Sequence, residues 1–155
     1  MTGAEAWRLR GRTLRAMLLL CVAQILIRLL RFRWWRATLG GVAPRDSAPL
    51  HIDPGPCTEA VDGPATGTAR RLAVHVERGA AQLPFATKCL PRAMALGWLL
   101  RHAGIAYDLT FAARPRAVRQ ALAGHDTLHA WVEVGGVTVI GALPGPWLAV
   151  LTLRG

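Results

Sequence analysis

The amino-acid sequence predicts an α+β fold in which helices come first and a small antiparallel sheet follows. Apolar residues recur with helical spacing over 68–79 and again from Cys89 to Gly104. Residues 105–113 and 129–134 instead alternate apolar and polar side chains, as strands do. Two glycines then separate 129–134 from the apolar segment 137–140, which predicts a hairpin with a two-residue turn. A chain of 155 residues has room for one such domain and an extension.

Residues 1–39 predict a basic, apolar helical segment ahead of this domain. Residues 1–45 carry nine arginines against Glu5 alone, a net charge of +8, whereas 46–155 carry only +2. The apolar part, residues 16–27, is twelve residues long, against the roughly 20 that span a bilayer. Two interpretations stay open: a helix packed on its own domain or on a partner protein, and contact of residues 4–39 with an anionic membrane surface. Nothing in the segment resembles a nucleic-acid-reading motif, so no nucleic acid is expected.

Residues 40–67 are rich in proline and glycine and are interpreted as a linker, with the compact domain over 68–155. The three cysteines, Cys21, Cys57 and Cys89, show no metal-ligand spacing, so neither a metal nor another cofactor is expected. An odd cysteine count with no clear secretion signal predicts reduced thiols in the cytoplasm, with peripheral contact at the inner face of the membrane left open. Residues 68–79 form the first helix of the domain in this interpretation, with His75 at its surface or half-buried, and residues 147–153 add a last short strand.

Cys89 and His129 are the candidate catalytic residues. Cys89 opens the helix that runs to Gly104, where the helix dipole and free N–H groups stabilise a thiolate. His129 heads the strand 129–134 and can take the thiol proton, which is the Cys–His form of an activated nucleophile. Trp131 shares the face of His129, and two interpretations stay open: it shields the imidazole, or it has a plain core or surface role. The pair predicts acyl-transfer chemistry, most simply that of a cysteine peptidase.

The order of these motifs is that of the papain-like and transglutaminase-like superfamily. Within it, the chain resembles the separate-chain leader peptidases of lasso-peptide biosynthesis. The residues that carry the likeness are Leu83-Pro84-Phe85, Cys89 to Leu96, Leu99 to Arg101, Gly104-Ile105, His129 to Val134, Gly136 and Val139 to Gly141. The resemblance implies a papain/transglutaminase-like core, with the nucleophile helix packed on a small antiparallel sheet behind an arginine-rich N-terminal helix.

The same resemblance implies a bacterial cytoplasmic enzyme that cleaves the leader from a ribosomally made precursor before a separate cyclase closes the macrolactam ring. The expected partners are the precursor peptide, a separate leader-binding protein and, less directly, the lasso cyclase. Residues 1–67 lack the strands that a leader-binding domain needs, so that domain is expected on another chain.

The third catalytic group is the difficulty. The family commonly carries an Asp on the strand after the turn, and here Gly141 occupies that position, next to Ala142. Three explanations stay open. The histidine is oriented by a backbone carbonyl or a water molecule, it is oriented by a side chain from elsewhere in the chain, or the site is impaired. Asp126 is the first candidate for an orienting acid and Asp108 the second, whereas Glu133 is expected to lie too far along the hairpin. His125 is a weaker alternative to His129 as the base.

The missing acid keeps other functions open. A non-catalytic scaffold that binds precursor or cyclase is the first alternative. Another thiol acyl-transfer enzyme, an amidase or a transglutaminase, is the second. The third is that Cys89 is a buried core thiol and His129 a strand-edge residue.

Overall fold

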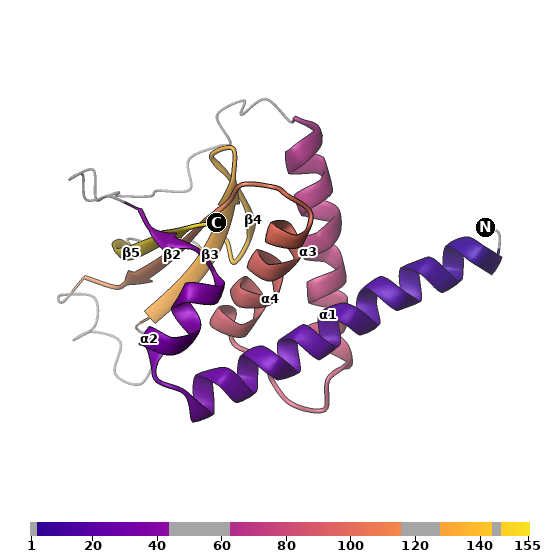
Figure 1. Ribbon diagram of the computed structural model, residues 1–155, viewed down its shortest axis with the longest axis horizontal. Helices are drawn as coiled ribbons and strands as arrows, with labels where there is room; N and C mark the ends of the chain where they lie inside the picture. Colours follow the sequence, from indigo (N-terminus) through magenta and orange to yellow (C-terminus); the bar gives the residue numbers. More distant parts are fainter. Residues whose placement is uncertain (1–2, 44–62, 116–127, 144–146) are drawn as a thin grey trace.

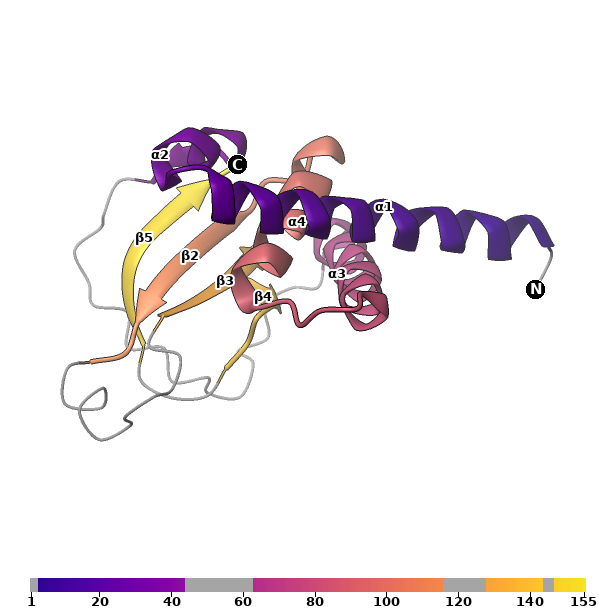
Figure 2. The same ribbon diagram turned by 90° about the horizontal axis from the view of Figure 1, so that it is seen from below.

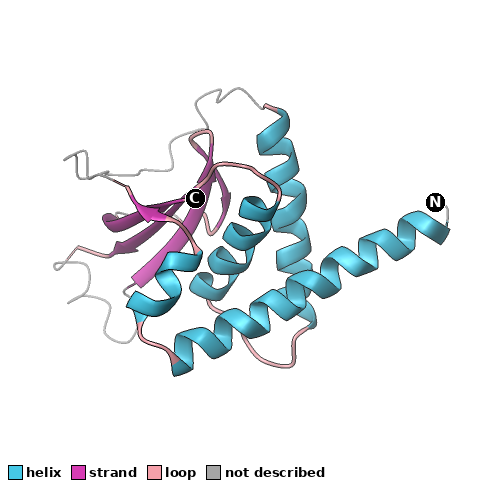
Figure 3. Ribbon diagram, viewed as in Figure 1, coloured by secondary structure: helices cyan, strands magenta, loops and turns pink. Residues whose placement is uncertain are grey.

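The fold is α+β, with the helices gathered on one side of a five-stranded antiparallel sheet, as the sequence predicts (Figures 1 and 3). The computed structural model describes residues 3–43, 63–115, 128–143 and 147–155. The helical elements are α1 (Gly3–Leu29), α2 (Phe32–Trp35), the 3-10 turn η1 (Arg36–Thr38), α3 (Pro64–Gln82) and α4 (Cys89–His102). The strands are β1 (Gly41–Val42), β2 (Asp108–Ala113), β3 (Leu128–Val134), β4 (Val137–Ile140) and β5 (Leu148–Arg154), in the spatial order β1-β5-β2-β3-β4.

Helix α1 is part of the domain core. Its small and apolar residues Ala16, Leu20 and Ala23 are fully buried in the same cluster as residues of α3 and α4. Gly79 of α3 permits a close approach, because a Cβ there would lie 3.2 Å from Cγ of Met17. The first part of α1 nevertheless projects beyond the other elements (Figures 1 and 2). One face of the basic segment therefore packs on its own domain, which is the first of the two interpretations of residues 1–39.

The expectation that His75 of α3 lies at the surface or half-buried is wrong. Its side chain is buried, and one ring nitrogen, Nδ1, lies 3.1 Å from the hydroxyl of Thr13 on α1. Burial lowers the pKa of His75, and the charges of Arg12 and Arg78 lower it further. The histidine is therefore a polar contact between α1 and α3 in which the neutral imidazole is favoured.

The packing of α1 predicts a clear stability difference between its two faces. Replacing the fully buried Leu20 by alanine is expected to lower the free energy of unfolding by about 2–5 kcal/mol, because it removes buried methyl groups and leaves a cavity. Leu18→Ala, on the same helix but 61% exposed, is the matched control and should change it by less than about 0.5 kcal/mol. Urea unfolding of both variants measures the difference, and equal losses would mean that α1 is not seated on the domain as described.

Two predicted boundaries are corrected at the ends of the linker. Helix α3 begins at Pro64, four residues before the expected start, because proline is well accommodated in the first helical turn, where its missing N–H removes no hydrogen bond. Residues Gly41 and Val42, assigned to the linker, form an edge strand paired with Arg154 and Leu153 of β5. The hydroxyl of Tyr107 also donates to the carbonyl of Leu39 at 2.6 Å. The rest of the expected linker, 44–62, lies outside the described residues.

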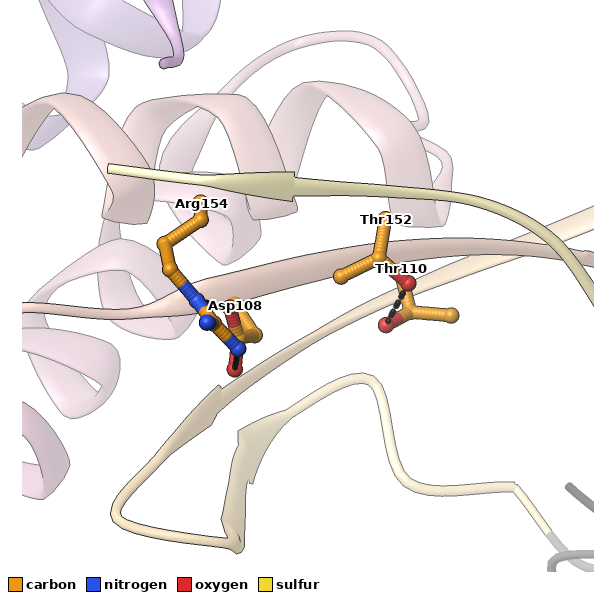
Figure 4. A network of polar contacts seen from close by, with 4 residues as sticks. All are labelled: Asp108, Thr110, Thr152 and Arg154. Atoms are coloured by element: carbon orange, nitrogen blue, oxygen red, sulfur yellow. Dashed lines mark hydrogen bonds and ion pairs between the residues drawn. The ribbon is translucent and has the colours of Figure 1, made fainter. Parts of the chain in front are cut away.

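The sheet places β2 between β5 and β3. Asp108 and Thr110 of β2 lie opposite Arg154 and Thr152 of β5. Arg154 donates to both carboxylate oxygens of Asp108, at 2.8 and 3.1 Å, and the two threonine hydroxyls are 3.2 Å apart (Figure 4). These side-chain contacts link β5 to β2, the middle strand of the sheet.

The hairpin of β3 and β4 turns at Gly135-Gly136, as predicted, and both glycines have positive φ, 60° and 80°. An irregularity between Val132 and Glu133 shifts the register, so that Ile140 lies opposite Val132. In a regular hairpin Gly141 would lie opposite Ala130. The irregularity therefore moves Gly141 by one position along β3. Periodicity in the sequence carries no signal for such a shift.

Candidate active site

Cys89 is the first residue of α4. Lys88 precedes it with extended backbone angles (φ −76°, ψ 176°) and makes no side-chain cap, so the first N–H groups of the helix are not taken by a capping side chain. The N–H groups of the first helical turn and the helix dipole both favour a negative charge at this end. Pro91 in the first turn removes no hydrogen bond from the helix. The sequence places a thiol where α4 stabilises a thiolate.

His129, the second residue of β3, is 8% exposed and lies next to Cys89. Its ring nitrogen Nε2 lies 2.5 Å from the carbonyl oxygen of Gly141, to which it donates. The imidazole also interacts with the Cys89 side chain, and both residues line the same pocket; because Nε2 is taken by Gly141, Nδ1 is the nitrogen that remains for the thiol. The geometry thus supplies a thiol, an imidazole in hydrogen-bond contact with it, and a carbonyl that holds the imidazole in one orientation.

Gly141 is suited to this role only as a glycine. Its φ is +82°, a backbone conformation that side-chain-bearing residues rarely adopt. A Cβ there would lie 2.6 Å from the carbonyl oxygen of Ala130 and 3.1 Å from Cα of Trp131. The position where the resembled family carries an Asp is therefore filled by a residue that offers its carbonyl to the histidine. This is the backbone-carbonyl alternative among those that the sequence left open.

The pKa shifts of the pair both favour charge separation. Burial raises the pKa of the Cys89 thiol, but the hydrogen bond from His129, the N–H groups of Ala130 and Leu90 and the charge of His129 lower it to a net value below the ordinary one. Burial lowers the pKa of His129, while the contacts with Cys89 and the Gly141 carbonyl raise it above its ordinary value; Arg114 opposes this. A thiolate–imidazolium pair is the state toward which both shifts lead.

These shifts predict how the reactivity of Cys89 depends on pH. The thiolate is lost as the pH falls through a pKa below the ordinary 9.0 of a free thiol, so alkylation of Cys89 should persist at lower pH than for a free thiol. The imidazolium is lost as the pH rises through a pKa above 6.5, which sets the alkaline limit of any step that needs His129 as an acid. Iodoacetamide labelling with peptide mapping, so that only Cys89 is counted, measures the acid limit. His129→Ala should move it upward, and an unmoved limit would mean that the imidazole does not act on the thiol.

Two tryptophans enclose the imidazole of His129. The ring of Trp131 stacks at a centroid distance of 6.2 Å, and that of Trp147 lies at 5.2 Å, tilted by 34°. Both indoles are buried, and the guanidinium of Arg114 lies 4.6 Å from the centroid of Trp147. Sequence reasoning found Trp131 from its alternation with His129 but missed Trp147, which stands just before β5. The two rings shield the imidazole from water and so limit competition for its hydrogen bonds.

A pocket of about 330 Å³ opens in front of the two candidate residues. It is lined by Glu77, Thr87, Cys89, Arg92, His129, Ile140, Gly141, Ala142 and Leu143. Arg92 donates to Glu77 at 2.9 Å and to the hydroxyl of Thr87 at 3.1 Å, which places an ion pair in the wall of the pocket. Sequence reasoning missed both charged residues, although Arg92 is three residues after Cys89 and so shares its helix face. The pocket offers a bound chain both apolar and hydrogen-bonding contacts.

The acids considered from the sequence do not reach His129 among the residues that the structure describes. Asp108 bonds to Arg154 and lies opposite Glu133, whereas His129 lies opposite Ala112, four residues along β2. Burial raises the pKa of Glu133, whose carboxylate accepts hydrogen bonds from the side chains of Trp131 and Thr138. Glu133 thus contacts Trp131 instead of the imidazole. The first candidate, Asp126, and the alternative base His125 lie outside the described residues.

No group of three His, Cys, Asp or Glu side chains that could hold a metal ion occurs within the described ranges. Cys21 and Cys89 are both free thiols.

A comparison with known protein families gives a match over most of the chain. The model of a family described as the transglutaminase-like superfamily matches residues 23–153, most of the chain. No curated protein and no solved structure matched significantly. The match begins within α1 and ends within β5, so it includes α4, the β3–β4 hairpin and the pocket between them.

Proposed function

Because the chain belongs to the transglutaminase-like superfamily, a fold of the cysteine peptidase and acyltransferase type, we propose that it is a cysteine peptidase that removes the leader from a lasso-peptide precursor. The observation that supports catalysis is the hydrogen-bonded Cys89–His129 pair at the wall of an open pocket. The lasso-peptide substrate rests on the motif resemblance, which includes the segment from Cys89 to Leu96 and the strand from His129 to Val134. The site of action is the bacterial cytoplasm, with a separate leader-binding protein and the cyclase as partners.

In the proposed reaction, the Cys89 thiolate attacks the scissile carbonyl carbon and forms a tetrahedral intermediate. N–H groups at the start of α4 stabilise the oxyanion, and the loss of one such donor typically costs ~100–1000-fold in rate. The imidazolium of His129 gives its proton to the leaving amine as the C–N bond breaks, which leaves a thioester on Cys89. Water then attacks the thioester while His129 takes its proton. The leader carboxylate leaves, and the thiolate–imidazolium pair is restored.

The Gly141 carbonyl fixes the tautomer in this scheme. By accepting Nε2–H it directs Nδ1 toward sulfur, which is the orientation that an Asp side chain provides in related enzymes. A neutral carbonyl stabilises imidazolium less than a carboxylate does. The thiolate is also stabilised by the N–H groups of Leu90 and Ala130, and this reduces the need for a negative orienting group.

The absence of a carboxylate at Gly141 favours one other candidate, a scaffold that binds precursor or cyclase without cleaving it. A transglutaminase or an amidase is the other candidate within the same superfamily. These candidates differ in the product that they leave, and not in the residues that line the pocket.

Mass spectrometry of a cognate precursor, incubated with its leader-binding protein and this chain, distinguishes them. A single cut made by the wild type and lost in Cys89→Ala supports a thiol leader peptidase. Cys21→Ala, which removes a free thiol on α1, is the matched control and should cleave normally. Intact precursor with retained binding would support the scaffold, and amine incorporation in place of hydrolysis would support a transglutaminase.

A further inference from the structure

Helix α1 carries a continuous apolar surface on the side away from the domain, which we call the outer stripe. Its members lie on one side of the helix, one turn apart from Leu14 onward with Gly11 between Leu14 and Trp7, and all are exposed, by 45–77%: Trp7, Leu14, Leu18, Val22, Ile25 and Leu29. They lie on the face opposite Ala16, Leu20 and Ala23, which pack in the core. The helix is thus apolar on two faces. One face packs in the core of the domain, and the other is exposed in the part of the chain that the structure describes.

The length and setting of the outer stripe indicate an extended binding surface. From Trp7 to Leu29 it spans about 33 Å at the rise of an α-helix. Figures 1 and 2 show α1 along the outside of the helical layer, with its N-terminal end beyond the other elements. Exposed apolar surface continues past the helix at Leu30, Phe32 and Trp34. A continuous apolar surface of this kind marks an interaction site in a folded protein.

The charges beside the stripe indicate what covers it. Arg10 and Arg28 flank it on one side and Arg15 on the other, and all three are exposed. Further exposed arginines follow in and around α2, where the guanidinium of Arg33 lies 5.3 Å from the centroid of the Trp34 ring. Residues 6–38 contain no Asp or Glu. An apolar stripe with Trp near both ends and arginines at its borders matches the boundary between acyl chains and anionic headgroups.

A second copy of the chain is a poorer occupant of this surface. Two outer stripes packed face to face would bring their bordering arginines together, with no carboxylate between residues 6 and 38 to compensate them. No helix among the described residues is long and apolar enough to cross a membrane. We infer that the outer stripe docks α1 in the plane of an anionic lipid bilayer, with the catalytic domain held at the membrane surface by the buried face of the same helix.

Co-sedimentation with lipid vesicles tests this inference on the full chain. The protein should pellet with phosphatidylcholine vesicles that contain phosphatidylglycerol, and much less with phosphatidylcholine alone. Leu18→Glu/Ile25→Glu should reduce the partition coefficient by about tenfold or more, because two charges enter the acyl-chain boundary. Arg10→Gln/Arg28→Gln should reduce it by about fivefold for each arginine, and added salt should weaken wild-type binding in the same direction.

Val74→Glu is the matched control, since Val74 is also exposed, by 45%, but lies on α3. All replaced side chains are exposed, and thermal unfolding of each variant verifies that the fold is kept. The inference is overturned if the wild type stays in the supernatant with anionic vesicles, or if the stripe variant binds as well as the wild type. It is also overturned if the wild type is a dimer that Leu18→Glu/Ile25→Glu converts to monomers and neither form binds vesicles. Vesicle binding requires no cleavage, so it stands or falls separately from the peptidase activity.

Discussion

Cys89→Ala is expected to lower the rate of precursor cleavage by on the order of 10⁶-fold, the size of loss that follows removal of the nucleophile in a hydrolase. His129→Ala should lower the cleavage rate by about 10²–10⁴-fold, because general acid–base catalysis is lost. The loss should be greater at low pH, because Cys89 then also lacks the partner that lowers the thiol pKa. The double variant should be no slower than Cys89→Ala, because the base has no function once the thiol is gone. Single-turnover cleavage followed by mass spectrometry measures all three rates.

Losses that multiply in the double variant would contradict a catalytic pair, because they would mean that the two residues act independently. Glu77→Gln is a useful contrast, since it breaks the ion pair with Arg92 in the pocket wall without touching sulfur or imidazole. Its effect should fall mainly on KM, whereas the effects of Cys89→Ala and His129→Ala should fall on kcat. The comparison separates residues that bind the peptide from residues that react with it.

The sequence predicted those features that depend on periodicity and on local backbone chemistry. The helix that carries the candidate nucleophile begins at Cys89, Gly104 follows its end with a φ of 66°, and the hairpin turns at Gly135-Gly136. Each of these features is specified by residues close together in the chain, so their patterns can be read without knowing the fold. The closeness of Cys89 and His129 was inferred from the order of motifs and not from periodicity, because the two residues are 40 positions apart.

The features that the sequence did not predict depend on tertiary contacts. The one-residue shift between β3 and β4 places Ile140 opposite Val132 and moves Gly141 with it. Trp147 stands just before β5, and only the folded sheet brings its ring to His129. His75 is likewise buried only because α1 packs on α3. No local sequence pattern specifies where α1 packs. Long-range packing and register therefore account for the differences.

Gly141→Asp, which restores the residue that the resembled family carries, is expected to impair the protein instead of improving it. The φ of +82° disfavours any side chain, and the new Cβ would meet the backbone oxygen of Ala130 at 2.6 Å, so β4 must shift. That shift would withdraw the carbonyl from His129. We expect a loss of about 1–3 kcal/mol in the free energy of unfolding and a fall in kcat of at least about tenfold.

Gly104→Asp is the control that isolates the cause. It has a similar φ of +66°, but a Cβ at this position would meet nothing within 4 Å, so the substitution adds backbone strain without a clash. Urea unfolding should show a smaller loss for Gly104→Asp than for Gly141→Asp, and cleavage by Gly104→Asp should be unchanged. An active and stable Gly141→Asp protein would contradict the role given to the carbonyl, because a carboxylate would then have replaced it without cost. A damaged one would mean that this chain orients its histidine by a backbone contact that excludes the usual acid.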